Sequence, residues 1–404
     1  MYSTMKISST SSPYKLTVVK GTLIGKFILA KSGILMERIL FFALLLMTTA
    51  LISCSRTNNQ PKTVTDVNHL LLKNYRPESI YHIPRSKVEK AKFHILDVHS
   101  HAYAETPEMV DLWVKNMDEV GIKKTIILSM ATGTKFDSIY NVYAGKYPDH
   151  FEVWCGIDYT GYDKPGFGPA AVAELERCYH VGARGVGEIG DKGKGLYYSN
   201  PGPKAWGMHP DDKRMDIIWE KCAELNMPVN IHVGDPIWMY QKMDSTNDGL
   251  MNAFEWRLDN QQGIVDNPGM LKILENTVKK HPNTKFIACH FANQTYNLKA
   301  LSKLLDAYPN LYADISGRFA ETAAVPRYTK KFYEKYQDRL MYGTDMGFNK
   351  QMYRITFRML ETEDEHFYEI DWFGYHWPWY GLGLSDQVLR KVYYKNAERL
   401  LNEF

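Results

Sequence analysis

Residues 93–101 read FHILDVHSH, a short apolar run that ends in two histidines spaced two residues apart. Seven more apolar, β-branched runs follow it, separated by longer stretches with helical periodicity. The eight runs are FHILDV (93–98), KTIILS (124–129), FEVWCGI (151–157), ARGVGE (183–188), PVNIHV (228–233), KFIACHF (285–291), LYADIS (311–316) and LMYGTD (340–345). This alternation is typical of βα units that build a parallel sheet.

The stretches between and after these runs predict eight helices. They are 108–120, 169–181, 213–226, 270–281, 298–307, 321–336, 352–361 and 385–402. Eight alternating pairs over about 310 residues predict an α/β fold, a (β/α)8 TIM barrel. A doubly wound open sheet is the alternative, although no GxGxxG turn follows the first run. Three long insertions, 189–212, 234–269 and 362–384, follow predicted strands, on the side where barrel active sites form.

Composition and charge exclude several classes of protein. The chain has 404 residues, of which 45% are hydrophobic and 24% charged, which is ordinary for a globular protein. Residues 1–53 carry six of its 49 Lys and Arg but one of its 46 Asp and Glu, so the net charge of +3 becomes about −2 without them. This balance argues against a nucleic-acid partner and against a broad electrostatic interaction with lipid.

The first 53 residues predict an export signal. Ile39–Ile52 form a 14-residue apolar run, shorter than the roughly 20 residues of a spanning helix but typical of a signal h-region. Ser53-Cys54 resembles a bacterial lipobox, and Met36 is an alternative start. We therefore expect a lipoprotein anchored through Cys54 on the periplasmic or cell-surface side; a plain signal peptide is the alternative.

The expected organisation has three parts. Residues 1–53 form the upstream extension and signal, 54–92 a tether and lead-in, and 93–404 the catalytic barrel. Four cysteines of the body lie in apolar or helical contexts without a CxxC pair, and we expect them to be buried and reduced rather than metal ligands. They are Cys155, Cys178, Cys222 and Cys289.

Polar residues close five of the predicted strands. They are His99, His101, Glu188, His232, His290 and Asp345. Any one of them could be a core histidine bonded to a carbonyl or an acid that caps a helix, but a buried unpaired charge is costly, and five strands that end this way favour a shared site. Histidines with carboxylates suit one or two divalent ions of the zinc class. Such an ion lowers the pKa of bound water to about 7.

Other residues predict the substrate pocket. Arg318, in ADISGRF after the seventh strand, could bind a substrate carboxylate, and Arg257 is a weaker candidate; either could instead form a structural ion pair. The long insertions are rich in aromatic residues that could stack on a small-molecule substrate or pack the loops. They include Trp206, Trp238, Trp256, Trp372, Trp377 and Trp379.

The strings DVHSH, GEIG, NIHVGD, ACHFAN and YGTD, in that order, resemble the amidohydrolase superfamily of metal-dependent hydrolases. The closing string YGLGLSDQVLRKVYYKNAERLL resembles its amidohydrolase-related (type 2) branch, so the resemblance covers residues 93–404. It implies that His99, His101, His232 and Asp345 bind the metal. It also implies that Asp345 accepts a proton from metal-bound water.

The resemblance leaves two residues with alternative roles. His290 matches a histidine that binds a second metal in some branches and acts as acid/base in the decarboxylases. Glu188 lies where many members have a carboxylated lysine, and GEIG is similar to the TatD-like nucleases, in which this Glu binds metal. Other type 2 members hold one metal and have no ligand on strand four, so the number of ions stays open. We expect Glu188 to be a metal ligand; a hydrogen bond to a neighbouring strand or loop is the alternative.

Three functions follow as expectations. The first is a metal-dependent hydrolase that attacks an amide, ester or lactone carbon, with Asp345 as base and Zn²⁺ as the expected ion. The alternative is a metal-dependent non-oxidative decarboxylase, a lyase, in which His290 acts as acid/base and an arginine holds the carboxylate. A non-catalytic surface-binding lipoprotein is the second alternative. The sequence leaves the substrate and the oligomeric state open.

Overall fold

The computed structural model describes residues 66–401, which fall into two units. Of the first unit, Met1–Leu70, it describes one short 3-10 turn, η1 (Val67–His69), whose first turn is capped by the Asp66 carboxylate. The second unit, Leu71–Phe404, contains the other described elements.

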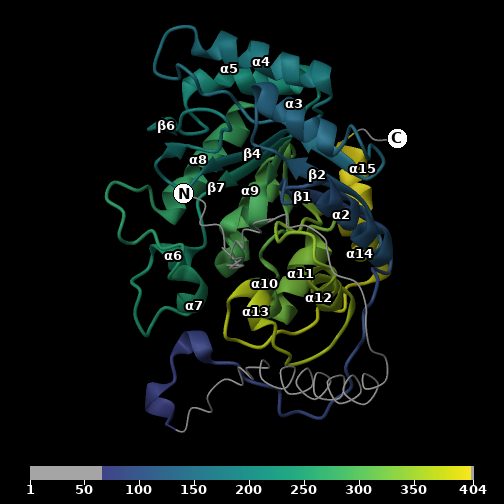
Figure 1. Ribbon diagram of the computed structural model, residues 1–404. Helices are drawn as coiled ribbons and strands as arrows, with labels where there is room; N and C mark the ends of the chain where they lie inside the picture. Colours follow the sequence, from purple (N-terminus) through teal and green to yellow (C-terminus); the bar gives the residue numbers. More distant parts are fainter. Residues whose placement is uncertain (1–65, 402–404) are drawn as a thin grey trace, which may run out of the picture. The chain divides into compact units, whose positions relative to one another are not determined.

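Eight parallel strands form the centre of the unit, and each overlaps one of the eight runs predicted from the sequence (Figure 1). They are β1 (Ile95–Ser100), β2 (Ile122–Leu128), β3 (Phe151–Trp154), β4 (Val186–Asp191), β7 (Val229–Val233), β8 (Phe286–Ala288), β9 (Leu311–Asp314) and β10 (Leu340–Met341). Each pairs in parallel with at least one other strand of the set. The prediction of a mixed α/β fold with central parallel strands is confirmed.

The strands are grouped in two sheets, with the orders β1-β2-β3 and β10-β9-β8-β7-β4-β5-β6. Backbone hydrogen bonds join the sheets at both junctions. Cys155 N donates to Gly185 O at 3.1 Å between β3 and β4, and Val98 N donates to Tyr342 O at 2.9 Å between β1 and the segment after β10. Closure into one regular barrel stays a prediction, because the ladders at these junctions are too short to form a single sheet.

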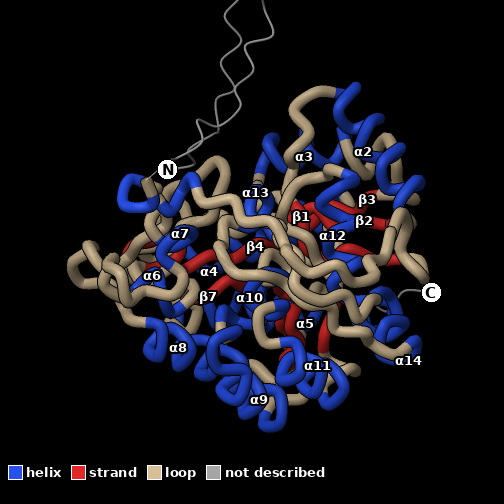
Figure 2. The backbone as a smooth tube through the Cα atoms, turned by 90° about the horizontal axis from the view of Figure 1, so that it is seen from below, coloured by secondary structure: helices blue, strands red, loops and turns tan. Residues whose placement is uncertain are grey.

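Helices cover the strands, as Figure 2 shows from below. They are α2 (Pro107–Val120), α3 (Gly133–Val142), α4 (Phe167–Val181), α5 (Asp216–Glu224), α6 (Ile237–Tyr240), α7 (Leu250–Ala253), α8 (Asn267–Lys280), α9 (Leu298–Ala307), α10 (Phe319–Ala323), α11 (Pro326–Lys335), α12 (Lys350–Glu361), α13 (Ile370–Phe373), α14 (Asp386–Arg390) and α15 (Asn396–Leu400). Short turns complete the set: η2 (Leu72–Asn74), η3 (Lys213–Met215), η4 (Cys289–Asn293), η5 (Thr295–Asn297) and the π-turn η6 (Lys391–Lys395).

Local sequence explains the bounds of helix α2. The Thr106 hydroxyl accepts a hydrogen bond from the Met109 N–H, Pro107 occupies the first turn, and Gly121 ends the helix with a φ of 92°. Its apolar face, which includes Trp113, is buried against the strands. Burial of this face is what holds the helix on the sheet.

Two predicted helices differ in the structure. The stretch 321–336 is wrong as a single helix, because Pro326 disfavours helical geometry at Val325 and separates α10 from α11. The stretch 385–402 is interrupted by the π-turn η6, although Ser385 caps its start as the sequence suggests. Helix α3 was not predicted, because Phe136 is its one buried side chain and its periodic signal is correspondingly weak.

The insertions carry small elements of their own. Strands β5 (Gly195–Leu196) and β6 (Ala205–Trp206) form an antiparallel extension of β4 within 189–212. Helices α6 and α7 lie in the insertion 234–269, and α13 lies in 362–384. The insertions 189–212 and 234–269 follow the carboxyl ends of β4 and β7 and so stand beside the residues that close those strands. The prediction that 362–384 also follows a strand is wrong, because helix α12 separates it from β10.

Candidate metal centre

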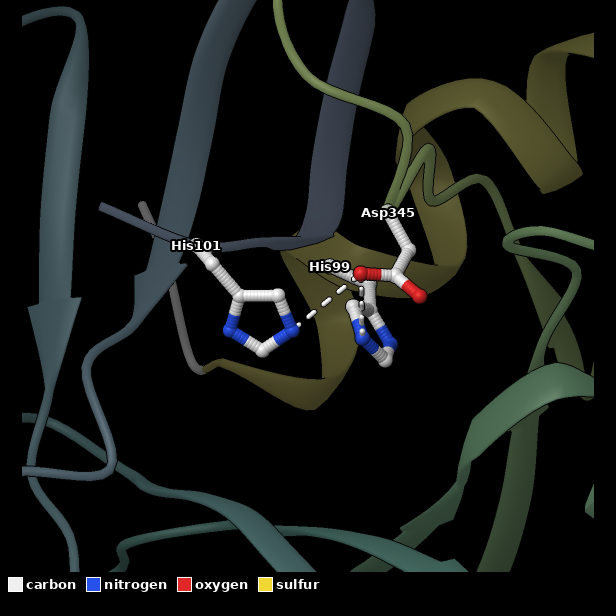
Figure 3. Close-up of side chains that lie close together, drawn as sticks. All are labelled: His99, His101 and Asp345. Atoms are coloured by element: carbon white, nitrogen blue, oxygen red, sulfur yellow. Dashed lines mark ion pairs between the residues drawn. The ribbon is translucent and has the colours of Figure 1, made fainter. Parts of the chain in front are cut away.

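The six polar residues predicted at the strand ends come together. They are His99, His101, Glu188, His232, His290 and Asp345. His101 Nε2 lies 3.1 Å from Asp345 Oδ1 (Figure 3). The same nitrogen lies 3.5 Å from Glu188 Oε2. His99 Nε2 lies 3.8 Å from Asp345 Oδ1, and His290 Nε2 lies 3.6 Å from Glu188 Oε1. Side chains up to 246 residues apart in the chain therefore share one small volume.

Backbone geometry brings two of these residues into the cluster. The sequence predicts His290 within a strand, but β8 ends at Ala288, and His290 follows in the left-handed conformation with a φ of 58°. Asp345, predicted at the end of a strand, follows the short β10 with a φ of 53°, and its N–H donates to His99 O at 2.9 Å. These turns redirect the side chains toward the ends of the neighbouring strands.

Three histidines use Nδ1 in the same way. His99 Nδ1 lies 2.9 Å from Asp314 Oδ2, His101 Nδ1 lies 2.8 Å from Leu128 O, and His290 Nδ1 lies 2.8 Å from Ser316 O. Each partner is an acceptor, so each Nδ1 carries a proton and the lone pair of the neutral ring is on Nε2. The Nε2 atoms all face the cluster. That of His99 is buried and has no hydrogen-bond partner in the part of the chain that the structure describes.

His232 differs from these three histidines, because both of its ring nitrogens lie within hydrogen-bond distance of a carboxylate. Its Nδ1 lies 2.7 Å from Glu188 Oε1, and its Nε2 lies 3.2 Å from Asp235 Oδ1. Asp235 is buried and also lies 3.1 Å from Lys192 Nζ. Because Asp235 can accept the Nε2 proton, His232 can present its Nδ1 to the cluster, next to Glu188.

The electrostatics of the cluster favour a cation. Burial opposes protonation of His99, but the charges of Asp314 and Asp345 outweigh it and raise its pKa to about 10. Burial likewise opposes ionisation of Glu188, yet the neighbouring His232 holds the pKa of that carboxyl well below its ordinary value. Ionised carboxylates therefore face ring nitrogens that attract protons when no metal is bound.

The donor set suits a divalent ion. Two groups of three ligand atoms lie within 4.8 Å of one another and share His99: one adds His101 and Asp345, and the other adds Glu188 and His290. Imidazole nitrogens and carboxylate oxygens are ligands of zinc and manganese. The unpartnered Nε2 of His99 and the converging Nε2 atoms fit such an ion.

Cys289 lies in a third group of this kind, with His99 and Asp314. Its thiol donates to Asn230 Oδ1, and burial raises its pKa well above the ordinary value. A neutral thiol is a poor ligand, so Cys289 fits its predicted role as a buried, reduced cysteine. The other three cysteines of the body, Cys155, Cys178 and Cys222, are also buried and unpaired.

The two candidate arginines have different surroundings. Arg318 follows Gly317, where a Cβ atom would lie 3.5 Å from His290 Nδ1, and it donates to Asn293 Oδ1 from Nη2 at 2.7 Å. Its side chain is 14% exposed. Arg257 instead forms a two-point ion pair with Asp259, at 2.8 and 2.7 Å. Arg318 therefore lies beside the cluster, and Arg257 is occupied elsewhere.

The aromatic residues of the insertions divide between surface and packing. Trp206 is 48% exposed and Trp256 is 53% exposed, with Lys192 Nζ lying 5.4 Å from the ring centre of Trp256. Trp379 is fully buried, and Trp377 Nε1 donates to Ala320 O at 3.0 Å. Trp377 and Trp379 therefore pack the loops, which is one of the two roles predicted for these tryptophans.

Sequence reasoning missed several residues that support the cluster. Asp314 closes β9 and bonds His99, Asp235 bonds His232, and the Tyr103 hydroxyl donates to Asp345 Oδ1 at 2.9 Å. Asp314 carried a usable signal, because it is a carboxylate in an apolar run, LYADIS, as Glu188 and Asp345 are in theirs.

The predicted lipidation site, Cys54, and the predicted signal segment lie outside the described residues. Among residues 66–401, no helix has the length and apolar character needed to cross a membrane.

Three solved structures illustrate the similarity of the chain to known proteins. An amidohydrolase from Staphylococcus aureus is 15% identical, covering 77% of this chain and 100% of the other, with a TM-score of 0.49. A 2,6-dihydroxybenzoate decarboxylase from Rhizobium is 17% identical, covering 77% of this chain and 99% of the other, with a TM-score of 0.46. A 5-carboxyvanillate decarboxylase from Novosphingobium aromaticivorans, complexed with manganese, is 14% identical. The match covers 78% of this chain and 98% of the other, with a TM-score of 0.46.

No curated protein matches the chain. A family model described as amidohydrolase matches residues 160–402, more than half of the sequence. The matched stretch includes Glu188, His232, His290 and Asp345, and it begins after His99 and His101. This chain belongs to the amidohydrolase family.

Proposed function

We propose that the chain is a metal-dependent enzyme that removes the carboxylate of a small organic acid as CO2 without an oxidant. The main support is Arg318, a largely buried cation beside the cluster, with 14% of its side chain exposed. Its Nη1 lies 3.7 Å from Glu321 Oε1, and that same oxygen accepts a hydrogen bond from the Tyr375 hydroxyl at 2.7 Å. Arg318 is therefore only partly paired and can bind a substrate carboxylate. This reverses the order of the two reactions expected from the sequence.

The proposed ligands are Nε2 of His99 and His101, Nδ1 of His232 and a carboxylate oxygen of Asp345. Glu188 lies 3.5 Å from His101 Nε2, close enough to be a further ligand. A bound divalent cation supplies Lewis acidity that polarises a substrate oxygen. Zinc is the ion expected from the sequence, and manganese is the ion in one structural neighbour, so both ions belong in the test.

The chain's own residues supply binding and proton transfer. Arg318 would orient the carboxylate. The bond between the carboxylate and its carbon then breaks, CO2 leaves, and the carbon keeps the electron pair and takes a proton. His290 is the proposed proton donor, because its Nδ1 is held by Ser316 O and only Nε2 faces the cluster. Because Nδ1–H already donates to Ser316 O, the proton that reaches the carbon is one that Nε2 first takes up from solvent. Burial lowers the pKa of His290, so the protonated ring gives this proton up readily and returns to the neutral form with its lone pair on Nε2.

Hydrolysis of an amide, ester or lactone is the second candidate. Glu188 favours it, since the resemblance associates a strand-four carboxylate with hydrolases rather than with decarboxylases. In this reaction Asp345 would accept the proton of the attacking water. Burial raises the pKa of Asp345, but the charge of His99 outweighs burial and lowers it overall, so the carboxylate is ionised and available as a base.

The test is a comparison of the two reactions on one preparation. The chain is stripped with a chelator and reloaded with Zn²⁺ or Mn²⁺. Release of CO2 is measured with panels of aromatic and aliphatic carboxylic acids, and acid release with lactones, esters and amides. We expect metal-dependent CO2 release that falls about 100-fold in kcat/KM in Arg318→Met, because the carboxylate loses its charged partner.

The control is Arg257→Met, which removes an arginine of the insertion 234–269 that is already paired with Asp259. It should change kcat/KM less than about threefold. Hydrolysis without CO2 release would reject decarboxylation in favour of the second candidate. Metal binding with neither activity would favour the non-catalytic binding protein that the sequence left open.

A further inference from the structure

We propose that Asp314 is a positioning residue whose two carboxylate oxygens have separate tasks: Oδ2 orients the metal ligand His99, and Oδ1 holds the segment that carries His290. The inference rests on the proposed function insofar as His99 binds a metal and His290 transfers a proton. It gives Asp314, which is not one of the proposed metal ligands, control over the orientation of both His99 and His290.

The Oδ2 side faces the ligand. It lies 2.9 Å from His99 Nδ1 and accepts a hydrogen bond from Asn230 Nδ2 at 3.1 Å. Both Asp314 and His99 are fully buried. A carboxylate on Nδ1 keeps the proton there, so that the lone pair is on Nε2, the atom that faces the cluster. Such a partner also fixes the plane of the ring and raises its basicity as a ligand.

The Oδ1 side faces the proton donor. It accepts hydrogen bonds from His290 N at 2.9 Å, from Ser316 N at 3.1 Å and from Ser316 Oγ at 2.6 Å. Ser316 Oγ in turn lies 2.9 Å from His290 Nδ1. Because the hydroxyl proton goes to Asp314, this oxygen is an acceptor for His290. The left-handed backbone of His290 is thus held at its N–H and at its ring by one carboxylate and the serine beside it.

Only an ionised carboxylate satisfies this arrangement. All five groups that face Asp314 donate to it, so neither oxygen is opposite an acceptor that a carboxyl proton could reach. An asparagine has the same shape, but its NH2 group would oppose donors in either orientation. On the Oδ2 side it would meet His99 Nδ1–H and Asn230. On the Oδ1 side it would meet the N–H groups of His290 and Ser316.

The experiment uses the full chain with Asp314→Asn and, as a matched control, Asp97→Asn. Asp97 is also a fully buried carboxylate on a central strand, within β1, but its partners are Thr344 and the backbone N–H of His99, not an imidazole. Affinity for Zn²⁺ and Mn²⁺ is measured by competition with a chelator, and folding by circular dichroism. We expect Asp314→Asn to weaken metal binding by about 10- to 100-fold and Asp97→Asn by less than about threefold.

Ser316→Ala separates the two sides. It removes one donor to Oδ1 and one contact to His290, so kcat should fall about tenfold while metal affinity and KM stay unchanged.

If Asp314→Asn does not fold, proton NMR of the zinc-loaded wild type replaces it. An imidazole proton resonance from His99 Nδ1–H supports the inference, and a proton on His99 Nε2 overturns it. Equal metal affinity in folded Asp314→Asn and Asp97→Asn also overturns it. Weakened metal binding without CO2 release would instead reject the proposed reaction and leave this inference standing.

Discussion

The strand ends and the long insertions of this chain both carry charged and aromatic side chains, but they hold them differently. At the strand ends His99, Glu188 and His290 are buried, and each is held by specific partners from other strands. In the insertions Arg257 pairs with an acid two residues away, and Trp256 is half exposed. Burial makes an unpaired charge costly, so the strand ends require exact partners, whereas the insertions can vary with little effect on the cluster.

The largest expected effect is at the strand ends. Asp345→Asn should lower kcat by about 100- to 10,000-fold, because the amide can neither accept a proton nor match the charge of the histidines around it. Circular dichroism should remain unchanged, and part of the metal affinity should be kept through the three histidines. Steady-state kinetics on the metal-loaded variant checks this, and turnover within tenfold of the wild type would remove Asp345 from the chemistry.

A smaller effect is expected in the insertion 362–384. Burial raises the pKa of Glu369 to about 7, against the opposing charge of Arg358, whose Nη1 lies 3.8 Å away. The folded state therefore binds this proton more tightly than the unfolded state does. The resulting stability is fully present below a pH of about 4.5 and is lost as the pH rises through about 7.

Glu369→Gln tests this dependence. At pH 8 the variant should be more stable than the wild type by about 1 kcal/mol, because it avoids burying a charge, and the advantage should shrink toward pH 5. Thermal unfolding at the two pH values measures the difference. Glu365→Gln, which changes an exposed acid of the same insertion, is the control. A difference that is the same at both pH values would contradict the assignment, and kcat at pH 8 should stay within about twofold.

The smallest effect on catalysis is expected at the proposed anchor. Cys54→Ser should release the chain from the membrane fraction, because the acyl chains would have no attachment point, while kcat of the released protein stays unchanged. Cell fractionation with Ser55→Ala as the control measures this. A Cys54→Ser chain that stays in the membrane fraction would count against lipid anchoring.

Local patterns explain how much could be predicted. All eight strands were found because each is a short apolar run with flanking breaks, a signal contained within a few residues. The residue types at the strand ends were equally visible, since a histidine or an acid in an apolar run is unusual. The division of the stretch 321–336 at Pro326 could also be predicted from the sequence, because proline disfavours helical geometry at the residue before it.

The sequence by itself determined the order of strands and helices and the chemical types that close the strands, because both follow from periodicity and burial. Only the tertiary structure decided how these groups pair. Asp314 bonds His99 across 215 residues, His290 reaches the cluster through a left-handed turn, and Arg318 rather than Arg257 lies beside it. Such pairings depend on strand register and on the direction in which each chain segment leaves its strand. Both are set by packing between distant segments, which no local pattern records.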